Sequence, residues 1–170
     1  MDLSVNKRPP LVSVNNVSFS YGATKILDRV TFSISAGDFL AIIGPNGSGK
    51  TTLLKIILGI LQPEKGSVKL LGENIKLFKQ WENIGYVPQK ATNIDSLFPV
   101  SVREVVAMGL LSQKKFPRFI RKKDEGAIDR ALEQVNLKDF KNRRIGELSG
   151  GQQQRVFIAR AIVNRPLILF

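Results

Sequence analysis

The first part of the chain alternates apolar and polar positions. Apolar side chains recur at almost every second position over residues 11–19, a pattern typical of a strand buried on one face. Residues 26–34 predict a second strand, and a Tyr-Gly pair at 21–22 predicts a turn between the two. A further turn is expected at residues 36–38, where a glycine precedes an aspartate. The chain therefore opens as two short strands joined by tight turns.

The pattern changes at residues 39–43, which form a continuous apolar run bounded by glycines. Such a run predicts a parallel strand buried on both faces. A glycine-rich loop follows, and residues 50–61 carry leucines and isoleucines at helical spacing. Residues 67–71 and 84–87 predict two more short strands, each bounded by turn-forming residues.

From Ser101 onward the spacing becomes helical. Ser101 is the expected N-cap of the first of these helices, and Glu104 stands at its third position, as in a capping box. Further helices are expected over residues 124–135 and from about 151 to 163. The last apolar run, residues 167–170, predicts a strand. The order of elements is a β-rich start, a strand–loop–helix unit and a mainly helical second half.

Composition narrows the chemistry that this chain can perform. With 170 residues, 43% of them hydrophobic, it can form one domain with a packed core. It contains neither cysteine nor histidine, which excludes disulfides, thiolate metal sites and imidazole catalysis. A net charge of +12 favours polyanions such as nucleotides, nucleic acid or an anionic membrane, or simply a basic solvated surface. The polar N-terminus and the absence of a long apolar run predict a cytoplasmic protein.

Residues 44–51 match the phosphate-loop pattern G-x-x-x-x-G-K-T/S at every specified position. Glycines allow the backbone N–H groups to point at one anion, and the helix that follows adds its N-terminal donors. The Lys50 ammonium can reach the β- and γ-phosphates, and the Thr51 hydroxyl can bind Mg²⁺. The match follows an apolar run and opens a helix, as this mechanism requires.

A second anion site is expected at residues 148–152, with the sequence Leu-Ser-Gly-Gly-Gln. A Ser-Gly-Gly turn is by itself an ordinary helix N-cap. However, the serine hydroxyl and glycine amides at the start of a helix can also bind an anion. The chain thus carries two helix starts suited to phosphate.

Together, residues 44–51 and 148–155 resemble the nucleotide-binding subunits of ABC transporters, whose signature motif the second segment matches. The resemblance spans residues 11–170. It implies an α/β fold of the ABC ATPase type, with a P-loop core, an antiparallel β subdomain and a helical insert, incomplete at its C-terminus. Within a single domain, 1–170, the β subdomain and P-loop core are expected at 11–89, the insert and signature at 90–160, and the start of the Walker B strand at 161–170.

The resemblance also implies roles for individual residues, with ATP and Mg²⁺ as cofactors. Tyr21 would stack on adenine, a contact that any base can make. Gln89 would contact Mg²⁺ or the attacking water, so that Lys50 and Gln89 are the catalytic candidates and Thr51 and Gln89 the metal ligands. Ser149 and Gly151 would contact ATP held by a second subunit, in a head-to-tail dimer. The full set of expected nucleotide contacts is Tyr21, Gly44, Pro45, Asn46, Gly47, Ser48, Gly49, Lys50, Thr51, Thr52, Gln89, Ser149, Gly150, Gly151 and Gln152.

One departure from the family pattern concerns hydrolysis. In the family, a strand like residues 167–170 is followed by Asp and by Glu, the general base, and later by a D-loop and a switch histidine. The sequence stops at Phe170, so ATP binding without efficient hydrolysis is expected of these 170 residues. Asp38 and Glu147 are interpreted as structural.

The expected function is that of an ATP-binding subunit powering import by an ABC transporter. Residues 98–109 resemble the region after the Q-loop in importers of zinc, manganese or iron, with iron-siderophore or cobalamin import as an alternative. Expected partners are transmembrane permease subunits, a second nucleotide-binding subunit and, indirectly, a substrate-binding receptor, at the inner face of the cell membrane.

Two other functions remain open: a nucleotide-binding module that lacks catalysis, and an ABC ATPase that acts on nucleic acid. The latter usually carries two cassettes, and a single phosphate loop makes a nucleic-acid partner unexpected. Six basic residues in the segment 114–123 either contact anionic headgroups or a membrane subunit, or form a solvated face.

Overall fold

The structure is a computed structural model that describes residues 9–89, 99–114 and 119–170. The chain divides into two compact units, Met1–Lys79 (unit 1) and Gln80–Phe170 (unit 2). Each unit buries its own set of apolar side chains. The three-part division expected at residues 89 and 160 stays a prediction, and its first boundary adjoins residues outside the described ranges.

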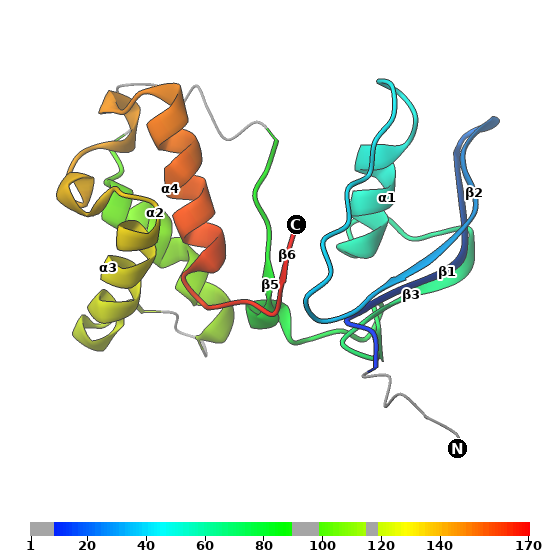
Figure 1. Ribbon diagram of the computed structural model, residues 1–170, viewed down its shortest axis with the longest axis horizontal. Helices are drawn as coiled ribbons and strands as arrows, with labels where there is room; N and C mark the ends of the chain where they lie inside the picture. The colour runs from blue at the N-terminus through cyan, green and yellow to red at the C-terminus, as the bar shows by residue number, and fades with distance from the viewer. Residues whose placement is uncertain (1–8, 90–98, 115–118) are drawn as a thin grey trace, which may run out of the picture. The chain divides into compact units, whose positions relative to one another are not determined.

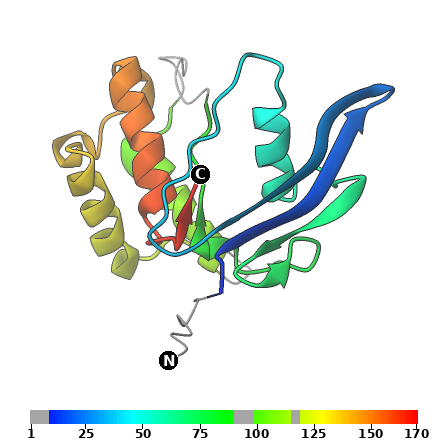
Figure 2. The ribbon, with the colours of Figure 1, turned by 45° about the vertical axis from the view of Figure 1, so that its right-hand side comes forward.

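Unit 1 is built on an antiparallel sheet with the strand order β2-β1-β3-β4 (Figure 1). Its strands are β1 (Val12–Tyr21), β2 (Thr24–Ile34), β3 (Lys65–Leu70) and β4 (Glu73–Asn74). The strands predicted over residues 11–19, 26–34 and 67–71 are confirmed. Val12 lies opposite Leu70 and Val14 opposite Val68, and all four are buried. These cross-strand pairs form the apolar face on which helix α1 packs (Figures 1 and 2).

Helix α1 (Lys50–Ile57) is shorter than the predicted 50–61 because Gly59 ends it. Gly59 takes the left-handed conformation, with φ of 68°. Its N–H donates to the Ile56 carbonyl at 3.0 Å, and the Ile60 N–H donates to the Lys55 carbonyl at 2.8 Å. This pair of hydrogen bonds is a Schellman motif, which satisfies the last helical carbonyls and turns the chain away.

The buried strand predicted over residues 39–43 is wrong. These residues lie in an irregular segment between β2 and α1, visible as the long loop of Figure 2, and the side chains of Phe39 and Ile43 are 96% and 92% exposed. A parallel strand needs a neighbouring strand to accept and donate its backbone hydrogen bonds. Among the described strands of unit 1, all of which pair antiparallel, none pairs with this segment. An apolar run indicates a tendency to be buried but provides no partner strand.

Unit 2 packs three helices around one core: α2 (Val102–Met108), α3 (Glu125–Gln134) and α4 (Gly150–Ile162). Val102 and Val106 of α2, Ile128 and Leu132 of α3 and Val156 of α4 are fully buried there. Short 3₁₀ segments lie between the helices, namely Gly109–Gln113, Lys122–Asp124, Lys138–Phe140 and Ile145–Glu147, and a further one, Trp81–Asn83, lies at the start of the unit. The helices predicted in this half of the chain are confirmed to within one or two residues.

Two short parallel strands accompany these helices, β5 (Ile84–Gly85) and β6 (Ile168–Leu169). Their ladder continues beyond the assigned strands, because the Val87 N–H donates to the Phe170 carbonyl at 2.9 Å. A Cβ at Gly85 would lie 2.7 Å from the Ala161 carbonyl oxygen, so only glycine permits this approach of β5 to α4. In the described part of the chain, no helix is both long and apolar enough to cross a membrane.

Candidate nucleotide-binding site

Residues 44–49 connect the exposed segment 39–43 to the start of α1. Gly47 and Gly49 have φ of 84° and 87°, a conformation that glycine adopts without steric cost. Gly49 is the N-cap of α1 and is buried against β2. A Cβ there would lie 2.9 Å from Leu27 Cδ2 and 3.1 Å from the Ile26 carbonyl oxygen. The start of α1 can therefore approach β2 this closely only if residue 49 is glycine.

The start of α1 presents hydrogen-bond donors to solvent. The first N–H groups of a helix have no acceptor within it, and the helix dipole adds partial positive charge there. The first turn of α1 contains no acidic side chain, and its N-cap makes no side-chain cap. Pro45, Asn46, Gly47 and Ser48 are exposed, and so is Thr51, whereas Thr52 is buried. This geometry suits a phosphate group and leaves the Thr51 hydroxyl accessible to a metal ion.

Lys50 folds its side chain back over the loop. The ammonium Nζ donates to the carbonyl oxygens of Gly44 at 2.8 Å and Pro45 at 2.7 Å, and lies 3.5 Å from Ser48 Oγ. A backbone hydrogen bond within the loop also stabilises it: the Ser48 N–H donates to the Pro45 carbonyl at 3.3 Å. The positive charge is thus held at the loop before any ligand arrives, and a phosphate would exchange its oxygens for these carbonyls.

Tyr21 ends β1, at the turn of the β1–β2 hairpin. Its side chain is 51% exposed, and its ring meets Phe19 edge to face with 4.9 Å between centroids and 86° between planes. The hairpin tip and the top of the phosphate loop project to the same side of unit 1 (Figures 1 and 2). An exposed ring that packs edge to face against a second ring is suited to stacking on a base. The contact of Tyr21 with adenine stays a prediction.

In unit 2, Ser149 is the N-cap of α4 in a capping box with Gln152. The Ser149 N–H donates to Gln152 Oε1 at 2.9 Å, and the Gln152 N–H donates to Ser149 Oγ at 3.4 Å. Gly150 and Gly151 are exposed, and a Cβ added to Gly151 would meet nothing within 4 Å. No acidic side chain lies in the first turn. The structural role as N-cap is therefore present, and the helix start is open to an anion as well.

One residue that positions this helix start was missed in the sequence. Gln153 is buried, and its Nε2 donates to the carbonyls of Ile145 at 3.3 Å and Leu148 at 3.2 Å. These bonds hold the segment that leads into Ser149. The middle position of a Gln-Gln-Gln run looks polar and exposed, but residue 153 lies three positions before the buried Val156 and so shares its face of the helix.

Gln89 is exposed and follows β5, at the edge of the described residues. It belongs to unit 2, whereas Lys50 and Thr51 belong to unit 1. In the described residues no group of three or more acidic side chains could hold a metal ion. The expected roles of Thr51 and Gln89 as Mg²⁺ ligands stay predictions. Phe98, where the resemblance to metal importers begins, lies outside the described residues.

The basic segment 114–123 is only partly a solvated face. Lys114 Nζ donates to both carboxylate oxygens of Asp124, at 2.6 and 2.7 Å, and this hydrogen bond, together with the Arg121 N–H, lowers the pKa of Asp124. Lys114 is therefore paired and mostly buried. Arg121, Lys122 and Lys123 are exposed, while Lys115 and Arg118 lie outside the described residues.

A phosphate loop in front of α1 and a second glycine-containing helix start define a nucleotide-binding domain of the phosphate-loop class. The chain belongs to the ABC transporter family, whose model matches residues 27–170. It is 50% identical over 159 residues to the zinc uptake system ATP-binding protein ZurA of Listeria innocua, covering 94% of this chain and 62% of that protein. It is 40% identical over 161 residues to the manganese transport system ATP-binding protein MntB of Halalkalibacterium halodurans, covering 95% and 63%.

The fold agrees with solved members of the family. A nucleotide-free ATP-binding cassette from an ABC transporter superposes with a TM-score of 0.79 at 28% identity, covering 95% of this chain and 68% of that one. The expected α/β fold of the ABC ATPase type is thereby confirmed. The chain spans 62% of the length of the Listeria relative.

Proposed function

We propose that this chain forms the ATP-binding part of an ABC transporter subunit that powers the import of a metal ion, with zinc as the cargo. The family and the likeness to ATP-binding proteins of zinc and manganese uptake systems support this proposal. Zinc is proposed because the identity to the zinc relative of Listeria innocua is 50%; a second zinc relative, from Bacillus subtilis, is 38% identical and the manganese relative is 40% identical. The metal would cross the membrane through permease subunits, with this chain at their cytoplasmic side.

The geometry of the phosphate loop carries the proposal. The N-terminal amides of α1 would hold the phosphates of ATP, and the Lys50 ammonium would exchange the Gly44 and Pro45 carbonyls for phosphate oxygens. Mg²⁺, when bound through Thr51 and Gln89, would neutralise charge on the β- and γ-phosphates. Tyr21 would stack on the base. The phosphate loop would then bind the triphosphate, and the Tyr21 ring would bind the purine.

A second copy of the subunit would complete the site. Ser149 and Gly151 stand exposed at the start of α4, with no acidic residue in that turn. These features support a contact with the γ-phosphate of ATP held on the partner's phosphate loop. In that arrangement Ser149 keeps its N-cap role, because its Oγ accepts the Gln152 N–H and its hydroxyl hydrogen stays available for the phosphate.

The test for nucleotide binding is the variant Lys50→Ala. It removes the charged donor, and we expect Mg-ATP binding to weaken by about 1.5–3 kcal/mol, the range for hydrogen bonds to charged groups. Binding is measured by titration calorimetry on the purified chain. The matched control is Lys55→Ala, an exposed lysine near the end of the same helix, which should bind Mg-ATP as the parent does.

Equal affinity of Lys50→Ala and the parent would refute the assignment of the loop. So would an equal loss in Lys55→Ala, because that would show a general charge effect. Circular dichroism of both variants verifies that the helix is intact. The cargo is tested separately, with the full-length subunit and its permease in vesicles: ATP-dependent uptake of zinc in preference to manganese is expected, and preference for manganese would refute zinc.

A further inference from the structure

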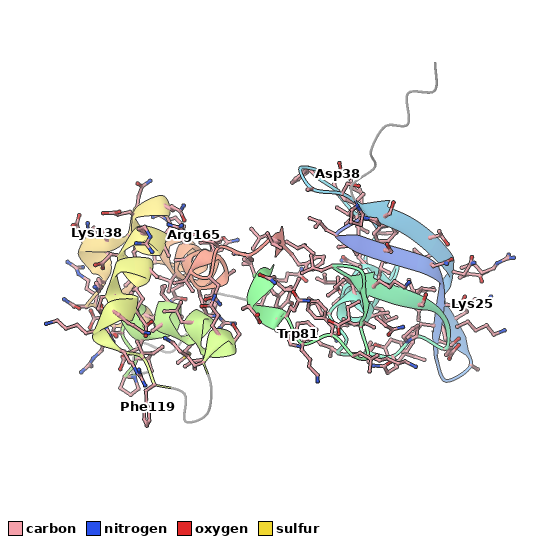
Figure 3. All side chains as sticks on the ribbon, turned by 90° about the horizontal axis from the view of Figure 1, so that it is seen from below. Lys25, Asp38, Trp81, Phe119, Lys138 and Arg165 are labelled. Carbon is pink, nitrogen blue, oxygen red and sulfur yellow. The ribbon has the colours of Figure 1, made fainter. Side chains whose placement is uncertain are left out.

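Unit 2 contains a cavity of about 280 Å³ that the nucleotide-binding function does not use. We call it the α3–α4 pocket, because it lies between the first turns of α3 and the residues that follow α4. Three exposed basic residues line it: Lys123 before α3, Arg130 within α3 and Arg165 after α4. Figure 3 shows Arg165 beside the end of α4, on the side that faces α3.

The acidic residue that lines the α3–α4 pocket does not pair with its basic residues. Among the described residues, Lys123, Arg130 and Arg165 form no ion pair or side-chain hydrogen bond. The only carboxylate in the lining is Asp124, and Lys114 already occupies both of its oxygens, at 2.6 and 2.7 Å. The pocket therefore presents three exposed basic side chains that form no ion pair with the described residues.

The guanidinium of Arg130 lies at the N-terminal end of α3. Arg130 extends back along α3, and its Nη1 lies 3.5 Å from where a Cβ on Gly126 would stand. Its guanidinium thus lies at the first turn of α3, and Gly126 leaves the space in front of that turn open. A second hollow of about 40 Å³ adjoins the pocket and shares Arg130 and Arg165 in its lining.

Asn164 adds an unfilled acceptor. Its Nδ2 donates to the Gly109 carbonyl at 2.6 Å and to Ser112 Oγ at 3.0 Å, which orients the amide. Its Oδ1 is buried and accepts no hydrogen bond from the described residues. This oxygen is closed off from solvent, so a ligand in the pocket would be held by the basic residues rather than by Asn164 Oδ1.

We propose that the α3–α4 pocket binds the phosphate group of a small phosphomonoester. A phosphomonoester carries about two negative charges at neutral pH, which suits three cations better than a single carboxylate does. The arginine fork matches its oxygens geometrically. The volume of about 280 Å³ lies just below the range of known ligand pockets, about 300–1,000 Å³, and suits a phosphate group with a few carbon atoms.

The experiment measures binding of glycerol 3-phosphate by calorimetry, in the Lys50→Ala background so that the phosphate loop does not contribute. We expect binding that Arg130→Gln weakens at least about tenfold, as the loss of a charged hydrogen-bond donor implies. Gly126→Glu should abolish it, because a carboxylate in the first turn of α3 would fill the pocket. Glutamate at position 126 favours helix formation more than glycine does, so the melting temperature of the Gly126→Glu protein should not fall. Lys122→Gln, an exposed neighbour outside the lining, is the control and should bind within about twofold.

Two further probes distinguish the sources of the phosphate group. Inorganic phosphate should bind more weakly than glycerol 3-phosphate, because it fills less of the pocket. Vesicles containing phosphatidic acid should show no binding that depends on Arg130. The proposal is overturned if glycerol 3-phosphate does not bind, if Gly126→Glu binds it like the parent, if Lys122→Gln loses as much affinity as Arg130→Gln, or if only the vesicles bind through Arg130.

Discussion

Two neighbouring residues, Gly49 and Lys50, show how much of the site is decided locally. Gly49 must adopt a left-handed conformation and come within contact distance of β2, and no other residue meets both demands at once. The motif therefore predicts the loop from sequence. It does not predict the direction of the Lys50 side chain, which the carbonyls of Gly44 and Pro45 determine.

The exposed ring of Tyr21 provides a second prediction at the scale of single residues. Replacing it in Tyr21→Ala should weaken the binding of ATP and of GTP together by about 1–3 kcal/mol, because stacking uses a face that every base has. The affinities are measured by calorimetry with both nucleotides. Tyr86→Ala removes the other tyrosine of the chain and is the control. A loss for one nucleotide exceeding that for the other by about tenfold, or 1.4 kcal/mol, would contradict stacking and indicate recognition of the base edge.

At the scale of elements, the β3–β4 hairpin contains an unfavourable residue. Its two turn residues, Leu71 and Gly72, have φ of 51° and 83°, so both adopt positive values as in a type I′ turn. Leucine resists that conformation, whereas asparagine tolerates it. We expect Leu71→Asn to raise the free energy of unfolding by about 1 kcal/mol, measured by chemical denaturation. An unchanged or lower stability would show that the partial burial of Leu71 outweighs its backbone strain.

Helices α2 and α3 are joined by a small ion network centred on Glu125. Its carboxylate accepts hydrogen bonds from Arg103 Nε at 2.9 Å and pairs with Lys141 Nζ at 2.8 Å. Lys141 also pairs with Asp129 at 2.6 Å. The hydrogen bond from Arg103, followed by that from Lys141, lowers the pKa of Glu125 from 4.5 to about 2. The charged form of Glu125 is therefore favoured by the fold.

This network implies a pH-dependent contribution to stability. Because the folded-state pKa lies below the ordinary one, the contribution is full above pH 4.5 and is lost as the pH falls toward 2. Glu125→Gln should lower the unfolding free energy at pH 7 by about 1 kcal/mol, with a difference that shrinks below pH 4. Glu133→Gln, which breaks the more exposed pair with Lys138, is the control and should cost less. A Glu125→Gln penalty that stays constant from pH 7 to pH 2 would contradict the network.

At the scale of the whole molecule, the features predicted from sequence are those that depend on near neighbours. The β1–β2 hairpin, the capping box at Ser101, the N-cap at Ser149 and the phosphate loop all follow from residues a few positions apart. The strand expected at 39–43 depended on a partner far along the chain, which no local pattern reveals. The buried amide of Gln153 and the basic lining of the α3–α4 pocket were missed for the same reason.

The net charge of +12 bears on how copies of the chain associate. Two such molecules repel one another, and bound ATP would reduce the repulsion at a shared site. Sedimentation should therefore show dimers with Mg-ATP and monomers without it. Ser149→Arg should remove the dimer while ATP binding remains. Asn142→Arg, which adds the same charge at another exposed position of unit 2, is the control. Unchanged dimerisation of Ser149→Arg would contradict a role of α4 across the interface.

The hydrogen bonds that Lys50 makes with Gly44 and Pro45 also govern its reactivity as an amine. The nitrogen of a lysine attacks an acylating reagent, and the Gly44 and Pro45 carbonyl oxygens lie against Lys50 Nζ, where the reagent would have to approach. Lys55, exposed on the same helix, has no such obstacle. Even with an empty loop, the lysine most important for phosphate is therefore shielded from covalent modification, and cellular acylation of this protein would fall first on lysines that the nucleotide does not need.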